Sequence, residues 1–299
     1  MVKRYGDVTA VDGLSLRVGR GEIYAFLGLN GAGKTTTVRL LLGMVRPTSG
    51  EVRVLGRRIR VGEKKPWDRV GYLVETADAY PELTVRENLD AMRRLRPGIE
   101  ARAVDRIIER LGLIPYADRR TGTLSLGNAQ RLGLAKALMH HPELLLLDEP
   151  ANGLDPAGIV EIRSLLIELA SEQGVTVFLC SHILAEVARL AKRIGILHQG
   201  KLLQELDLEE LERNRRRRLV VRTRNDAAAL AVLRSQGWSP ELDSDGAIEI
   251  KDGAAIERPD DVATRLVQAG CPPTALVVEE EDLEHYFLRL VGLEGGGAQ

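Results

Sequence analysis

Short apolar runs alternate with amphipathic segments along the first two thirds of the chain. Apolar runs that end at a glycine or an acidic residue predict buried strands, and apolar residues at helical spacing predict helices between them. The predicted strands are residues 22–28, 51–54, 70–74, 144–147 and 175–180, and the predicted helices are residues 34–43, 84–95, 100–111, 129–139 and 159–170. Strands that alternate with helices favour an α/β domain built on a mainly parallel sheet.

Four consecutive arginines, Arg215–Arg218, mark a change in this pattern. Shorter elements follow, with strands near residues 219–223, 247–251 and 275–278 and helices at 226–236, 260–269 and 283–290. We therefore expect a large domain over residues 1–213, a small C-terminal α+β domain over 214–292 and a flexible tail over 293–299. The arginine run indicates a solvated linker, and contact with anionic lipid headgroups is the alternative.

Composition limits the classes of protein that fit this chain. The 299 residues are 44% hydrophobic, enough for a packed core, and a formal net charge of -1 gives no basic field for nucleic acid. No apolar run approaches the roughly 20 residues of a membrane-spanning helix, and residues 1–6 lack a signal-peptide core. Cys180 and Cys271 have no metal-ligand spacing, so each is expected to be a buried apolar residue in a reducing cytosol.

A phosphate-binding loop follows the first predicted strand. Residues 28–35 fit the pattern G-x-x-x-x-G-K-[ST], in which glycines let successive main-chain N–H groups face phosphate oxygens. Lys34 can reach the β- and γ-phosphates, and the Thr35 hydroxyl can bind Mg²⁺. The flanking strand and helix argue against the alternative, a chance glycine-rich turn. The predicted ATP-binding residues here are Gly28, Leu29, Asn30, Gly31, Ala32, Gly33, Lys34, Thr35 and Thr36.

Two acidic residues follow the apolar run at 144–147. A carboxylate at the end of a buried strand places Asp148 beside the Mg²⁺ ion, and Glu149 can polarise the attacking water. A strand with a polar end is common by itself, but together with the phosphate-binding loop these residues indicate the Walker B element. The two motifs predict a P-loop ATPase that uses ATP and Mg²⁺.

The segment just upstream narrows the class. Leu124 is followed by Ser125, Leu126, Gly127 and Asn128, and this segment resembles the LSGGQ signature of ATP-binding-cassette (ABC) ATPases. In that family the signature contacts the γ-phosphate bound to the opposite subunit. The resemblance therefore implies a dimer, expected to be a homodimer, with two ATP molecules between the subunits.

Other elements of the ABC family occur in the expected order over residues 1–210. Asp155 ends a segment that resembles the D-loop, and His182 resembles the histidine that contacts the γ-phosphate. Tyr5 lies where the family has an aromatic residue that stacks on adenine. The resemblance implies a P-loop ABC ATPase domain with antiparallel and helical subdomains beside the parallel sheet. It also implies catalytic roles for Glu149 and His182.

Three departures from the family pattern are visible. Leu126 and Asn128 replace a glycine and a glutamine of the signature, while Ser125 and Gly127 are kept. Glu75 stands where most members have a glutamine that binds Mg²⁺ or water. The family also has a strand before Tyr5, so either the start is misassigned or this edge is shortened. Together with residues 130–133, Glu75 and Leu126 resemble the branch that exports antibiotics and lantibiotic-type peptides, with simple drift as the alternative.

The C-terminal segment and the family resemblance indicate a transporter. Residues 279–290 resemble the ending of ABC-2-type export ATPases, although they also fit an ordinary amphipathic helix. The resemblance implies a polytopic membrane permease as partner, contacted near Glu75 and residues 84–95, and a peripheral position on the cytoplasmic face of the membrane. A non-transport ABC ATPase, another P-loop kinase or GTPase, and an exporter of lipid, polysaccharide or ions are the alternatives.

Overall fold

The computed structural model describes residues 1–62, 66–75, 78–96, 98–243 and 246–292. It divides into two compact units, Met1–Leu208 and Glu209–Gln299. This division falls at the start of helix α7 (Leu208–Asn214), whereas the sequence pattern placed the boundary near the end of that helix. The expected tail over residues 293–299 lies outside the described residues.

A six-stranded sheet forms the centre of the first unit. Its strand order is β10 (Lys201–Asp207), β9 (Arg193–His198), β3 (Ile23–Leu27), β8 (Thr176–Ser181), β7 (Leu144–Asp148) and β6 (Val70–Leu73). Every neighbouring pair is parallel except β9 and β10. The prediction of a mainly parallel sheet is confirmed, and the parallel strands bring the ends of β3, β7 and β8 to one edge.

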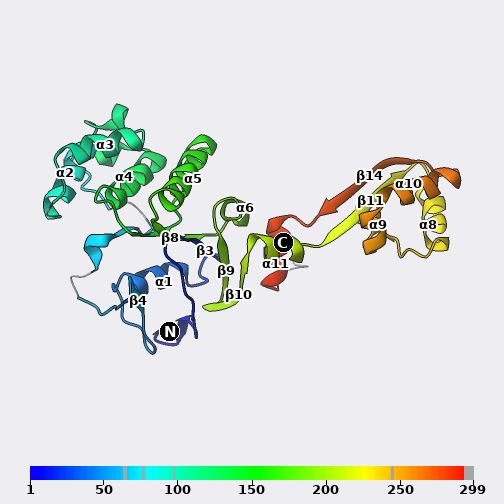
Figure 1. Ribbon diagram of the computed structural model, residues 1–299, viewed down its shortest axis with the longest axis horizontal. Helices are drawn as coiled ribbons and strands as arrows, with labels where there is room; N and C mark the ends of the chain where they lie inside the picture. The colour runs from blue at the N-terminus through cyan, green and yellow to red at the C-terminus, as the bar shows by residue number, and fades with distance from the viewer. Residues whose placement is uncertain (63–65, 76–77, 97, 244–245, 293–299) are drawn as a thin grey trace. The chain divides into compact units, whose positions relative to one another are not determined.

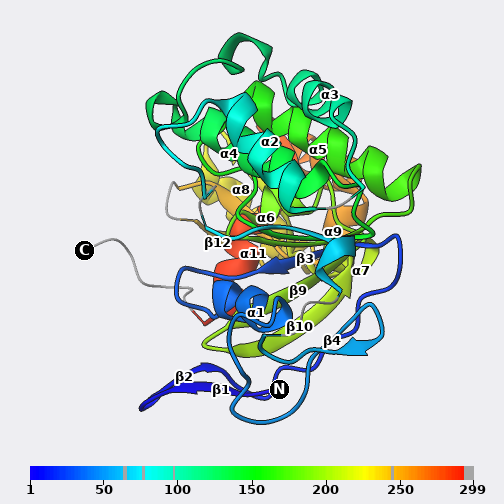
Figure 2. The ribbon, with the colours of Figure 1, turned by 90° about the vertical axis from the view of Figure 1, so that its left-hand side faces the viewer.

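Helices cover both faces of this sheet. Figure 1 shows α1 (Lys34–Leu41) on one side and α2 (Val85–Leu95), α3 (Arg102–Arg110), α4 (Leu126–Leu138) and α5 (Pro156–Ser171) on the other. Figure 2 shows the same four helices grouped above the sheet. The short helix α6 (Leu184–Val187) follows β8, and 3₁₀ turns span Trp67–Arg69, Ile114–Tyr116 and Thr121–Thr123. No helix within the described ranges has both the length and the apolar character that crossing a bilayer requires.

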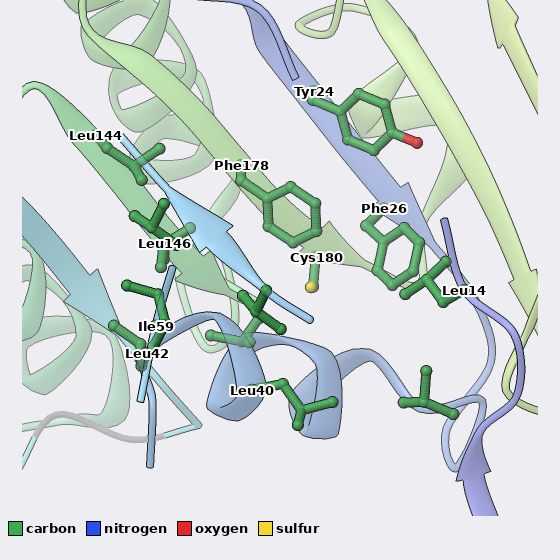
Figure 3. Packing of buried hydrophobic residues seen from close by; sticks show 14 of the residues in the cluster. Leu14, Tyr24, Phe26, Leu40, Leu42, Ile59, Leu144, Leu146, Phe178 and Cys180 are labelled. Carbon is green, nitrogen blue, oxygen red and sulfur yellow. The ribbon is translucent and has the colours of Figure 1, made fainter. Parts of the chain in front are cut away.

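The core between the sheet and α1 is aromatic and aliphatic. Tyr24 and Phe178 stack with their ring centroids 5.6 Å apart, and Phe26 packs beside them (Figure 3). Cys180 is fully buried in the same layer, and burial raises the pKa of its thiol, as expected of an inert core cysteine. Cys271 is only partly buried, so the expectation of two buried cysteines is wrong for this residue.

Four short strands of the first unit lie outside the main sheet. β1 (Lys3–Tyr5) pairs with β2 (Val8–Val11), and β4 (Arg53–Val54) pairs with β5 (Arg57–Arg58). The strand predicted at 51–54 is thus reduced to two residues. The sequence pattern missed the other three strands because each has only two to four residues, too few to show a strand periodicity.

The second unit contains an antiparallel sheet with its own core. The strand order is β12 (Glu241–Leu242), β13 (Ile248–Ile250), β11 (Arg217–Thr223) and β14 (Pro273–Glu280). Its apolar face packs against α8 (Asp226–Ser235), α9 (Gly253–Glu257) and α10 (Pro259–Gln268). The terminal helix α11 (Leu283–Leu290) buries Tyr286 and Phe287. The fold is therefore α+β, as the sequence predicts.

The second half of the arginine run is part of this sheet, and ion pairs hold the run in place, so it is not a solvated linker. Arg217 and Arg218 begin β11 and lie opposite Glu280 and Glu279 of β14. Arg218 Nη2 lies 2.8 Å from a Glu279 carboxylate oxygen, and Arg215 Nη1 lies 3.2 Å from one of Glu280. The linker prediction was wrong because the matching acidic residues are distant in the sequence but adjacent across the sheet.

Candidate functional site

The phosphate-binding loop connects β3 to α1 by a tight turn that requires glycine. Gly33 has φ of 108°, and a Cβ added there would lie 2.3 Å from the Ala10 carbonyl oxygen. Asn30 and Gly31 are exposed at the tip of the loop, while Ala32 is buried. The N-terminus of α1 therefore opens at the edge of the sheet where β3 ends, as the motif predicts.

Lys34 is buried and its ammonium group lies at the centre of the candidate site. Nζ donates a hydrogen bond to the Gly28 carbonyl at 2.6 Å and lies 3.4 Å from the Leu29 carbonyl oxygen. It also lies 3.2 Å from Glu149 Oε1. The lysine of the loop and the glutamate after β7 are thus paired, although 115 positions separate them in the sequence.

Asp148 lies beside the loop at the end of β7 and is 1% exposed. The Thr35 hydroxyl donates to its Oδ2 at 2.5 Å, and its Oδ1 has no hydrogen-bond partner among the described residues. Burial raises the pKa of this carboxyl, with a further contribution from ionised Glu149, against the lowering effect of the Thr35 hydrogen bond. A hydroxyl beside an incompletely satisfied carboxylate is an oxygen donor set that suits Mg²⁺.

Glu149 also contacts the predicted histidine. His182 follows β8, and its Nδ1 lies 2.9 Å from Glu149 Oε2. Because the two oxygens of Glu149 face Lys34 and His182 separately, the carboxylate lies between the two predicted phosphate-binding side chains. The structure therefore brings together Lys34, Thr35, Asp148, Glu149 and His182, all proposed from the sequence.

The signature segment forms the start of α4. Ser125 is exposed and caps this helix, with its Oγ accepting from the Asn128 N–H at 3.3 Å. Leu126 is 56% exposed and packs against Gly153, where an added Cβ would lie 2.4 Å from Leu126 Cγ. The absence of a side chain at Gly153 thus makes room for the leucine that departs from the family pattern.

Asp155 is the N-cap of helix α5. Its Oδ1 accepts a hydrogen bond from the Gly158 N–H at 2.9 Å at the start of α5. Gly127 approaches the same turn, since a Cβ added there would lie 2.7 Å from the Gly153 carbonyl oxygen. The predicted signature and D-loop segments therefore pack against each other within one chain.

Within the described ranges, Tyr5 and Glu75 form no hydrogen bond or ion pair with Lys34, Thr35, Asp148, Glu149 or His182. Tyr5 ends β1 with 45% of its surface exposed, and Lys3 Nζ lies 4.5 Å from its ring centroid. Glu75 has φ of 59° and pairs with Arg39 Nη2 at 2.8 Å. The ionised Glu75 nevertheless contributes, after burial and nearer groups, to the raised pKa of Asp148.

Sequence reasoning missed two residues near this site. Arg39 lies on the loop's helix and holds Glu75, and Gln130 on α4 donates from Nε2 to the Glu149 carbonyl at 2.8 Å. Gln130 is 2% exposed. A glutamine on an otherwise apolar helix face was the available signal, because a buried amide needs a hydrogen-bond partner.

The chain is similar in sequence to known ATP-binding proteins of transporters. The sequence profile of the family described as "ABC transporter" matches residues 11–152. Bacitracin transport ATP-binding protein BcrA of Bacillus licheniformis is 39% identical over 295 residues, covering 98% of this chain and 95% of that protein. Lantibiotic transport ATP-binding protein SrtF of Streptococcus pyogenes is 36% identical over 218 residues, covering 71% and 93%.

A solved structure matches over a similar part of the chain. The dimeric structure of MJ0796, a bacterial ABC transporter cassette, superposes with a TM-score of 0.63 at 27% identity and covers 69% of this chain and 95% of that one. Only the bacitracin relative among these three aligns along nearly the whole length, so its similarity includes most of the second unit.

Proposed function

Because the chain belongs to the ATP-binding proteins of ABC transporters, we propose that it drives the export of a peptide antibiotic through a separate membrane permease. It is the ATP-binding and ATP-hydrolysing subunit of such a transporter. The meeting of Lys34, Glu149 and His182 at the edge of the sheet carries the assignment of the hydrolytic site. The substrate class rests on the bacitracin and lantibiotic relatives.

Different residues of the chain have separate roles in ATP hydrolysis. The loop N–H groups and Lys34 bind the phosphates, for which the ammonium group exchanges its contact with Glu149 for phosphate oxygens. Thr35, Asp148 and Glu75 would hold Mg²⁺, which when bound neutralises phosphate charge. Released from Lys34, Glu149 polarises the attacking water, and His182 orients the γ-phosphate and the Glu149 carboxylate.

A second copy would complete each site. Ser125, Leu126, Gly127 and Asn128 begin α4 with an exposed N-terminal turn that can donate to the γ-phosphate on the opposite subunit. The dimeric MJ0796 cassette supports this arrangement. Tyr5, exposed on β1, would stack on adenine.

A groove beside Glu75 is the proposed docking site of the permease. It has a volume of about 550 Å³, and its lining includes Tyr72, Tyr80, Met92, Arg96 and Lys136. Tyr80 is 63% exposed, so the groove offers an aromatic surface to a partner helix. This docking would hold the chain at the cytoplasmic face of the membrane.

The first experiment is affinity purification of the tagged chain from detergent-solubilised native membranes. We expect one polytopic membrane protein in near-equal amount. Co-purification with cytosolic proteins alone would contradict the transport proposal and favour a non-transport ABC ATPase.

A second experiment tests the substrate class. The chain and its membrane partner, expressed in a sensitive bacterium, should raise the bacitracin concentration needed to stop growth, and the Glu149→Gln variant should not. Resistance to a lantibiotic but not to bacitracin would assign a lantibiotic as the substrate. Resistance to neither compound would refute peptide antibiotic export.

A further inference from the structure

Glu149 has a left-handed backbone conformation, which is unfavourable for a glutamate unless the surrounding structure fixes it. Its φ is 52°, in the left-handed region where Cβ crowds the following carbonyl oxygen. Residues in such conformations persist where the surrounding structure fixes them, and they gather at active sites. The groups that hold the main chain of Glu149 therefore also set the direction of its carboxylate.

Three hydrogen bonds hold this main chain. The Glu149 N–H donates to the Cys180 carbonyl at 3.0 Å, and the Glu149 carbonyl accepts from the Asn152 N–H at 3.1 Å. Both bonds join main chain to main chain. The third comes from Gln130 Nε2 at 2.8 Å and is, within the described ranges, the one in which a side chain holds this carbonyl.

The burial and orientation of Gln130 suit this bond. It is 2% exposed on α4, so water does not replace the bond, and a carbonyl acceptor requires the amide nitrogen to face Glu149. Helix α4 is also the helix that Ser125 caps. The bond therefore joins the signature segment to the backbone of Glu149 within one chain.

We propose that Gln130 is a positioning residue for ATP hydrolysis, whose amide holds Glu149 in the left-handed conformation that directs its carboxylate between Lys34 and His182. The inference rests on the proposed function, since it takes Glu149 as the group that polarises water. It predicts that loss of the donor slows the chemical step and leaves ATP binding intact.

Gln130→Glu provides a nearly isosteric test. At pH 8.5 an ionised glutamate cannot donate to the carbonyl, so kcat should fall about tenfold while KM for ATP stays the same. Burial raises the pKa of a carboxyl, so the variant should regain its donor by protonation, and the ratio of its kcat to that of the wild type should increase from pH 8.5 to pH 6. Gln130→Met should show the same loss with no recovery at low pH.

Gln268→Glu is the matched control, because the same substitution falls on an exposed position of the second unit. Its kcat and pH profile should equal those of the wild type. Wild-type protein that does not hydrolyse ATP would refute the proposed function itself. Active wild type with unchanged kcat in both Gln130 variants, or with a rise in KM matching the fall in kcat, would refute the positioning role.

Failure of the Gln130 variants to fold would also be informative. Glycine adopts φ near 52° without steric cost, so a Glu149→Gly background needs no side chain to hold this conformation. Gln130→Met should recover folding in that background. If it does not, Gln130 serves general packing and the inference is wrong.

Discussion

The carboxylates of Asp148 in the first unit and Glu281 in the second meet opposite electrostatic environments. Glu281 accepts two hydrogen bonds from Arg289, at 2.8 and 2.7 Å, and one from the Arg216 N–H, and the Arg289 bonds lower its pKa. Burial raises the pKa of Asp148, and one of its oxygens has no hydrogen-bond partner among the described residues. The charge of Glu281 is satisfied by the fold, whereas that of Asp148 requires a ligand.

This contrast separates charges that hold structure from charges that do chemistry. Incompletely satisfied groups at an active site cost stability, because binding of the substrate and its metal ion is what satisfies them. Substitutions at the ATP site should therefore change turnover more than stability. Substitutions in the second unit should do the reverse.

The largest expected effect is that of Lys34→Ala on turnover. Loss of the ammonium group removes a phosphate contact, so ATP turnover should fall by about 100-fold or more. The unfolding temperature should change little, because the cost of burying the Lys34 ammonium group in the absence of ATP offsets the loss of its contact with Glu149. Steady-state ATPase assays and thermal unfolding measure both, with Lys251→Ala on the exposed surface of the second unit as control. Similar turnover in the two variants would contradict the assignment of Lys34.

The second unit should show the opposite response with Glu281→Ala. Removal of a carboxylate that accepts three hydrogen bonds leaves Arg289 without this partner, so the free energy of unfolding should fall by about 2 kcal/mol. ATP turnover by the folded protein should be unchanged. Denaturant unfolding tests this against Glu241→Ala, whose exposed ion pair with Lys251 contributes about 0–1 kcal/mol. An equal loss of unfolding free energy in the two variants would show that the hydrogen bonds of Glu281 contribute no more than an exposed ion pair.

Stability should depend on pH with opposite sign at the two carboxylates. The raised pKa of Asp148 means that its ionised form destabilises the fold, a cost that shrinks as the pH falls through the folded pKa and vanishes below the ordinary 3.8. The lowered pKa of Glu281 means a stabilising contribution above the ordinary 4.5 that is lost as the pH falls through the folded pKa. Asp148→Asn should thus raise the unfolding temperature at pH 7, and Glu281→Gln should lower it.

Unfolding curves between pH 7 and pH 3 give the comparison directly. Both differences from the wild type should shrink toward the acid end. A stabilising Glu281→Gln or a destabilising Asp148→Asn at pH 7 would reverse the contrast between the two units.

The smallest expected effect concerns packing at the signature. Gly153→Ala should destabilise the first unit through its φ of 76° and through the clash with Leu126, and adding Leu126→Gly should remove the second part. The coupling energy of this double-mutant cycle should be about 1 kcal/mol. Gly174→Ala, at φ of 68° with open space around it, measures the backbone part alone. Additive effects of Leu126→Gly and Gly153→Ala would mean that the two residues do not share this space.

Much of the ATP site could be predicted because its determinants are local. The loop pattern at residues 28–35 specifies a turn by its own glycines, and the strands ending at Leu27 and Asp148 are apolar runs. Because β3, β8 and β7 are parallel neighbours in the sheet, their carboxyl ends lie together without any additional contact to place them. Asp148 beside Thr35 follows from that geometry.

Contacts between distant or exposed segments could not be predicted. Arg215–Arg218 indicated a linker because no local feature reveals the glutamates of β14. The bond from Gln130 to Glu149 depends on how α4 lies beside the segment that follows β7, and the pairing of Arg39 with Glu75 depends on side chains at the surface. Each of these is decided by tertiary packing, which periodicity along the sequence does not report.

The central claim is that Glu149 activates water for ATP hydrolysis in a dimer closed by the signature segment. The most direct test is Glu149→Gln, studied by ATPase assay and by size-exclusion chromatography with and without ATP and Mg²⁺. We expect turnover to fall by about 100-fold or more, with ATP retained and a dimer that forms only in its presence. Rapid turnover by the variant, or a monomer that stays monomeric with ATP bound, would contradict the account.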